Sequence, residues 1–183
     1  MGIASPLFEI EILQQGWLPG DGQSDLCTHG QLRLGVGWQD ITTGAADETY
    51  GISQSALALL RTVERDHSRV RPVAERLVFH GCGLILMMGC PIGIDWSVEH
   101  SGGGVRLSDI VRYDSVSEAE AVLFPNLAVE LPERAYRLQI AEFARRAKEP
   151  FVSAQKAFSD DYDRQQYKEF WAEYDVLLVR AAQ

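Results

Sequence analysis

The segment from Leu77 to Val98 constrains the fold more than any other part of this chain. Its sequence, LVFHGCGLILMMGCPIGIDWSV, combines an apolar centre with several Gly, one Pro and two of the three Cys. Gly and Pro interrupt its longest apolar stretch, at 83–94, and that stretch is too short to cross a membrane. Short apolar runs bounded by such turn residues are typical of buried strands. The segment therefore predicts the central hairpin of a buried sheet.

Alternation of apolar and polar residues predicts further strands on both sides of this segment. Residues 8–13 have the sequence FEIEIL, and residues 32–36 alternate in the same way, with the two-residue period of a half-buried strand. Ser101-Gly-Gly-Gly104 predicts a hairpin turn, because glycine adopts positive φ without steric cost. The remaining expected strands are 76–80, 84–88, 94–100, 105–113 and 126–131.

Three stretches have the period of a helix with one apolar face. The first covers 53–67, and Ser53 is its expected N-cap. The second begins at Pro132, where a proline costs no hydrogen bond. The third, with Ser159 or Asp160 as its cap, extends almost to the C-terminus.

The length of the chain and the order of these elements bound the architecture. A chain of 183 residues has the size of one domain, so we expect a single domain over 1–183. Strands, one helix, more strands and then two helices predict an α+β fold. We expect a mainly antiparallel sheet of about five or six strands, covered by one mid-chain helix and two C-terminal helices. Three Cys without disulfide spacing favour a reducing, cytoplasmic location.

The charge is unevenly spread along the chain. The formal net charge is −9, and residues 1–60 contain seven acidic residues and one basic residue, whereas the rest contains 19 acidic and 16 basic residues. Such a surface repels nucleic acid, whose recognition needs clustered Lys and Arg. It attracts and steers a basic protein partner. The alternative is that the acidity serves solubility alone.

Two loops, 16–30 and 39–51, hold most of the acidic residues of this N-terminal third. We expect a partner-binding surface on these loops, with two tryptophans as apolar anchors, because Trp is favoured at interfaces. The residues assigned to this surface are Trp17, Asp21, Asp25, Trp38, Asp40, Asp47 and Glu48. The alternative for each tryptophan is that it covers the core at a strand end.

A competing hypothesis is a small enzyme or zinc protein that uses the cluster Cys27, His29, His80, Cys82 and Cys90. Thiolate and imidazole ligands suit zinc, and residues two apart in a strand point to the same face. The five side chains would converge if the 25–30 loop folded over the 80–90 hairpin. A Cys82 nucleophile would instead pair with His80 or His29, with Asp25 as the group that orients the base.

The spacing of these residues argues against both versions of that hypothesis. Structural zinc sites usually contain C-x₂₋₄-C or H-x₃₋₅-H pairs, and this sequence has neither. It also lacks a nucleophile elbow, a P-loop, a dinucleotide-binding fingerprint and HExxH. We expect Cys82 and Cys90 to be small buried apolar residues. We therefore assign no catalytic residue, no metal and no cofactor.

In its size, its acidity and its lack of catalytic motifs, the chain resembles the small acidic bacterial immunity proteins that neutralise secreted toxins. The resemblance concerns general character, and no residues are carried over from it. It implies a non-catalytic cytoplasmic protein that occludes a basic protein partner such as a toxin domain. Neither a nucleic acid nor a membrane is an expected partner.

Overall fold

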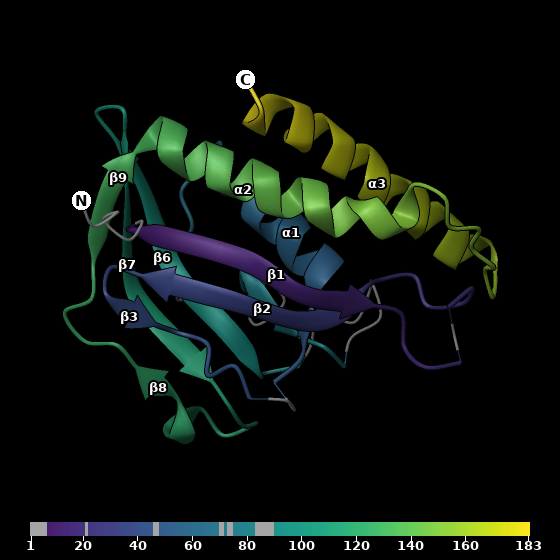
Figure 1. Ribbon diagram of the computed structural model, residues 1–183, viewed down its shortest axis with the longest axis horizontal. Helices are drawn as coiled ribbons and strands as arrows, with labels where there is room; N and C mark the ends of the chain where they lie inside the picture. The colour runs from purple at the N-terminus through teal and green to yellow at the C-terminus, as the bar shows by residue number, and fades with distance from the viewer. Residues whose placement is uncertain (1–6, 21, 46–47, 70–71, 73–74, 83–89) are drawn as a thin grey trace.

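The computed structural model describes all residues except 1–6, 21, 46–47, 70–71, 73–74 and 83–89 (Figure 1). The described part forms three α-helices and one sheet. The helices are α1 (Ile52–Arg61), α2 (Glu133–Lys148) and α3 (Asp161–Ala181). The strands are β1 (Phe8–Gly16), β2 (His29–Val36), β3 (Gln39–Asp40), β4 (Tyr50–Gly51), β5 (Val78–His80), β6 (Gly93–Ser101), β7 (Gly104–Tyr113), β8 (Val122–Leu123) and β9 (Val129–Pro132).

The sheet is antiparallel throughout its described pairs. Its order is β1-β2-β4-β5-β6-β7-β8, with β3 added beside β2 and β9 added beside β7. The hairpins β1–β2 and β6–β7 are its longest pairs, and the short strands β4 and β5 join them. At the tip of the β6–β7 hairpin, Gly102 and Gly103 have φ values of 57° and 83°. Only glycine adopts positive φ at two successive residues without a large steric cost, so the glycine run determines the position of the turn.

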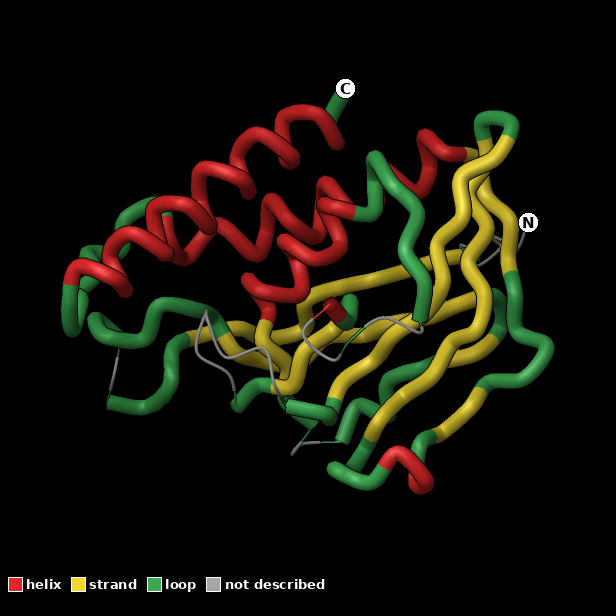
Figure 2. Tube along the Cα trace, turned by 180° about the vertical axis from the view of Figure 1, so that it is seen from behind, coloured by secondary structure: helices red, strands yellow, loops and turns green. Residues whose placement is uncertain are grey.

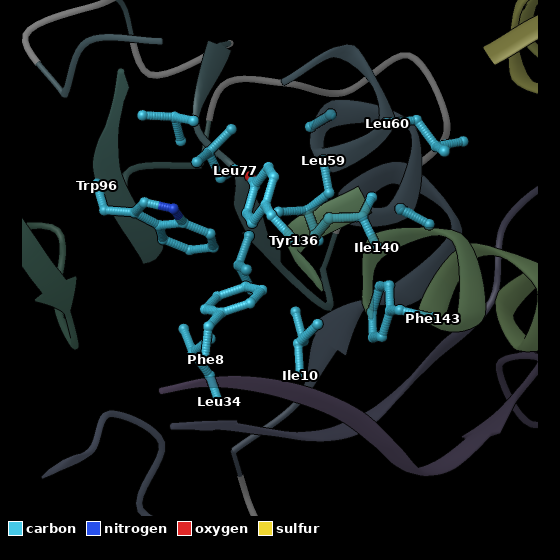
Figure 3. Close-up of a cluster of buried hydrophobic side chains, with 14 of the residues drawn as sticks. Phe8, Ile10, Leu34, Leu59, Leu60, Leu77, Trp96, Tyr136, Ile140 and Phe143 are labelled. Atoms are coloured by element: carbon cyan, nitrogen blue, oxygen red, sulfur yellow. The ribbon is translucent and has the colours of Figure 1, made fainter. Parts of the chain in front are cut away.

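The apolar faces of the strands and helices meet in one core (Figure 3). Phe8 lies between Trp96 and Tyr136, with ring centroids 6.2 Å and 5.5 Å away. These three side chains join β1, β6 and α2. Ile10 of β1 and Ile140 of α2 continue the contact along the two elements. Aromatic packing of this kind contributes beyond the area it buries, so this cluster ties the layers together.

All three α-helices gather on one side of the sheet (Figure 2). α2 packs along β1 and against α1, and α3 packs on α1 and α2 as an outer layer. β1 is the edge strand, and α2 covers that edge: Gln139 donates to the carbonyl of Ile10 at 2.9 Å, and Arg146 donates to that of Ile12 at 3.1 Å. These bonds occupy backbone acceptors that would otherwise be open to another strand.

The predicted α+β class, the antiparallel sheet and the arrangement of one mid-chain and two C-terminal helices are confirmed. The predicted number of about five or six strands is too low, because the described sheet has nine. The strands that the prediction lacked include β3, β4 and β8, each of two residues. A strand of only two residues is too short to show an alternation of apolar and polar residues. The expected strand at 84–88 lies outside the described residues.

The helix boundaries differ from the expectation mainly in α1. The helix ends at Arg61 instead of His67, because His67 exchanges two backbone hydrogen bonds with Val98 of β6. Its N-cap is Gly51, and the predicted cap Ser53 instead accepts a hydrogen bond from the Thr28 amide at 3.1 Å. At α3 the prediction is confirmed, since the Asp160 carboxylate accepts from the Asp163 amide.

The two tryptophans Trp96 and Trp38 provide a matched test of this core. Trp96 is 0% exposed, whereas Trp38 is 85% exposed. We expect Trp96→Ala to lower the free energy of unfolding by about 3–5 kcal/mol, because it opens a large cavity. Trp38→Ala should change it by less than about 0.5 kcal/mol. Urea unfolding followed by far-UV circular dichroism measures both, and equal losses would contradict the placement of Trp96.

Candidate functional site

Trp38 and Asp40 lie where the charge pattern predicted a partner-binding surface. Trp38 lies in the turn between β2 and β3, and Asp40 lies in β3 with 65% of its side chain exposed. The Asp40 carboxylate accepts from the Arg33 guanidinium at 3.2 Å. Asp21 and Asp47, assigned to the same surface, lie outside the described residues.

Asp25 does not belong to an exposed surface, so its assignment needs correction. The residue is 1% exposed. Its carboxylate accepts hydrogen bonds from the backbone amides of Leu18 at 2.9 Å and Cys27 at 3.2 Å. A carboxylate in a loop can turn inward when backbone donors replace its water, which the sequence pattern does not reveal. Asp25 therefore organises the β1–β2 loop.

Trp17 and Glu48 are half-buried, and both are occupied by contacts within the chain. The Trp17 ring packs edge-on against Phe151 at 4.7 Å, and the Lys156 ammonium lies 3.1 Å from its centroid. The Glu48 carboxylate accepts from the Gly44 amide at 2.8 Å and from the Tyr50 hydroxyl at 2.6 Å. Each side chain therefore holds a loop in place, and neither is a free anchor for a partner.

The described surface includes two acidic residues on β1, Glu9 and Glu11, that the loop-based assignment missed. Glu9 follows Phe8 in the alternation of β1, so its side chain points away from the core. In the ladder it lies opposite Gly35, which in turn lies opposite Asp40. We call Glu9, Arg33 and Asp40, together with Trp38 in the adjoining turn, the open-face patch. Glu9, Arg33 and Asp40 belong to the face of the sheet on which none of the described α-helices lies (Figure 2). The FEIEIL alternation was the signal that could have located Glu9.

The five Cys and His residues of the competing hypothesis form two separate clusters. In the ladder, His29 lies opposite Gly51 and Gly51 lies opposite Phe79, whereas His80 lies opposite Tyr50. Residues paired across strands share a face and successive residues alternate, so His29 and His80 point to opposite faces. The convergence of the two Cys–His pairs that the competing hypothesis required is therefore not found.

The first cluster, Asp25, Cys27 and His29, is buried on the helix side. Cys27 Sγ lies 3.5 Å from both Asp25 Oδ1 and His29 Nε2, and His29 Nε2 lies 3.2 Å from Asp25 Oδ2. Burial, followed by the neighbouring Asp25 charge, raises the pKa of the Cys27 thiol far above its usual range. The thiol is therefore neutral and 0% exposed, which is the opposite of an activated nucleophile.

The second cluster contains His80 at the end of β5, Cys82 just after it and Cys90 before β6. Cys90 Sγ lies 3.7 Å from His80 Nδ1, and the three donor atoms lie within 4.8 Å of one another. Cys82 is exposed and Cys90 is half-buried, so the expectation that both are buried core residues is wrong. Partial burial, and then the hydrogen bond with Cys90, raises the pKa of the Cys82 thiol.

A buried His67–Asp95 pair is a further polar feature that the sequence pattern did not indicate. His67 Nε2 lies 2.8 Å from Asp95 Oδ1, and both side chains are almost fully buried. Burial raises the pKa of the Asp95 carboxyl, and the hydrogen bond from His67 opposes that shift. The pair fastens the segment after α1 to β6. It lies beside a cavity of about 410 Å³ between α1 and α3, whose lining mixes both signs of charge.

Comparison of the chain with protein-family models, with curated proteins and with solved structures finds no match. Among the described residues, no helix combines the length and the apolar character needed to cross a membrane. The argument about function therefore rests on the surface and the clusters described above.

The three Cys residues should differ sharply in reactivity toward iodoacetamide. Cys82 is exposed and should be alkylated first in the folded protein, whereas Cys27 is enclosed. We expect Cys27 to react at least about 1,000-fold more slowly than in denaturant, because labelling requires a local opening of several kcal/mol. Peptide mapping by mass spectrometry measures each rate. Rapid labelling of Cys27 in the folded chain would contradict its burial.

Proposed function

We propose that the protein is a non-catalytic acidic binding protein that occludes a basic protein partner, as an immunity protein occludes a toxin in the cytoplasm. The observation that carries this proposal is Trp38, a large aromatic side chain that is 85% exposed on a surface turn. Large apolar side chains of this exposure mark interaction sites when they stand beside polar residues. Asp40 lies two residues further along the chain, and Glu9 lies on the same face of the sheet as Asp40.

The turn that carries Trp38 is tied down on both sides. The Gly37 amide donates to the Leu7 carbonyl, and the Ile41 amide donates to the Leu34 carbonyl, both at 2.8 Å. The backbone on either side of Trp38 is therefore fixed to β1 and β2. An anchor held on a rigid element loses little conformational entropy on binding, which favours its use as a contact residue.

Charge would raise the rate at which the partner associates more than it would raise the final affinity. Within the open-face patch Arg33 offsets part of the acidity, since it lies near both Glu9 and Asp40. The attraction therefore comes mainly from the whole chain, with its net charge of −9. Such a field raises the association rate of a basic partner and weakens as salt screens it.

The competing enzyme hypothesis placed its nucleophile at Cys82, which is exposed and clusters with His80. The burial of the first cluster counts against Cys27 as a nucleophile in its place. A nucleophilic thiol must be partly exposed and must ionise near neutral pH. Cys27 is enclosed by Leu26, Phe158 and Phe170, and its pKa is raised. His29 contacts both Cys27 and Asp25 through the same ring nitrogen, Nε2, so it lacks the two-sided bonding of a catalytic triad.

Partner capture with a matched pair of double variants tests the proposal. The wild-type protein is immobilised and exposed to lysate of its source organism at low salt, and captured proteins are quantified by mass spectrometry. We expect Trp38→Ala with Asp40→Lys to weaken capture of a basic protein by about 2 kcal/mol or more, roughly 30-fold, because an interface anchor is lost.

The control is Tyr162→Ala with Asp161→Lys on α3, which removes an aromatic residue that is 64% exposed and reverses an acid paired with Arg164. This variant should capture the partner as wild type does. Equal capture by both variants would refute the role of the open-face patch. Captured partners that are themselves acidic, or capture that is insensitive to salt, would refute the electrostatic part of the proposal.

A further inference from the structure

The second cluster, His80, Cys82 and Cys90, has no part in the proposed binding function. We propose that it binds a zinc ion through the His80 imidazole and the two thiolates, with the fourth coordination position open to solvent. A set of one nitrogen and two sulfur donors binds zinc in preference to harder cations such as magnesium.

The distances within the cluster fit a tetrahedral ion. With Zn–S near 2.3 Å and Zn–N near 2.0 Å, neighbouring sulfur and nitrogen ligands of a tetrahedral zinc lie about 3.6 Å apart. Cys90 Sγ and His80 Nδ1 are 3.7 Å apart, and Cys82 Sγ lies within 4.8 Å of both. Cys82 supplies the third ligand, and its side chain is exposed.

The surrounding backbone holds His80, at the end of β5, close to Cys90, which precedes β6. Phe79 of β5 pairs with Gly93 of β6, which brings the residues beyond the pair together. Gly93 has φ of 151°, and a Cβ there would lie 2.3 Å from the Val78 carbonyl, so the two strands approach as only glycine permits. The Arg76 guanidinium donates to the Pro91 carbonyl, next to Cys90.

Accessibility distinguishes this cluster from the buried one. A metal site needs an entry path, and here one ligand is exposed and two are half-buried. His80 also lines a surface hollow whose other polar lining residues include Glu48, Tyr50 and Arg112. The first cluster has contacts of similar length, but its thiol donates to the Asp25 carboxylate, which also accepts from two backbone amides.

Zinc titration of the full chain under reducing conditions tests the proposal. Zn²⁺ is titrated against a chromophoric chelator, and Co²⁺ replaces it for absorption spectroscopy. We expect one ion per chain and a thiolate-to-cobalt band with the intensity of two thiolates. Cys82→Ser, Cys90→Ser and His80→Ala should each weaken zinc binding by more than about 100-fold, because even the loss of an outer-shell partner costs about 10- to 100-fold.

Two control variants separate the site from the rest of the chain. Cys27→Ala removes the thiol of the first cluster, and His100→Ala removes a half-buried imidazole that bonds to the Thr62 carbonyl. Both should bind zinc as wild type does. The absence of stoichiometric zinc, a cobalt spectrum without thiolate bands, or a loss of affinity in Cys27→Ala but not in Cys82→Ser would overturn the proposal. A Cys82–Cys90 disulfide that resists reduction and excludes zinc would overturn it as well.

Discussion

The pairing of two very short strands, β4 and β5, is the constraint on which the rest of this structure depends. The β1–β2 hairpin and the β6–β7 hairpin each have enough alternation to form locally. Among the described strands, only β4 (Tyr50–Gly51) and β5 (Val78–His80) connect them into one sheet. α1 begins directly after Gly51, so the same junction sets where this helix starts beneath the other two. The Gly81 amide extends the junction by donating to the Thr49 carbonyl at 2.9 Å.

This junction also decides what the Cys and His residues can do. Phe79 lines the cavity beside α1 and α3, and the next residue, His80, lines the hollow beside Tyr50. The alternation of one strand therefore separates an enclosed cluster from an accessible one. The enclosed cluster contributes to the packing of the β1–β2 loop, while the accessible cluster is the one for which we propose a zinc ion.

The parts of the fold that the sequence predicts are those with a long periodic pattern. β1, β2, β6, β7 and the three helices all have such patterns, and their class and order were predicted correctly. The short strands carry no period, and the end of α1 depends on a pairing between His67 and Val98 that is distant in sequence. Long-range register of this kind is not encoded in local alternation.

The candidate site was predictable only where exposure follows from position in an element. Trp38, in the turn after β2, and Asp40, in β3, are exposed as expected. Asp25 lies in a segment with the composition of a surface loop, but it is buried and accepts hydrogen bonds from backbone amides. The separation of His29 from His80 depended on the register of β4, which has two residues. The proposed class of partner thus rests on charge and composition, while the grouping of the Cys and His side chains requires the fold.

The central structural claim is that the two clusters are separate. Nuclear Overhauser spectroscopy on the reduced, metal-free protein tests it most directly, because it detects short distances between protons. The account predicts contacts between the ring protons of His80 and the β-protons of Cys90, contacts between His29 and Cys27, and none between the two sets. Contacts from the His29 ring to Cys82 or Cys90 would show that the side chains converge, and would contradict the β2–β4–β5 register on which the account depends.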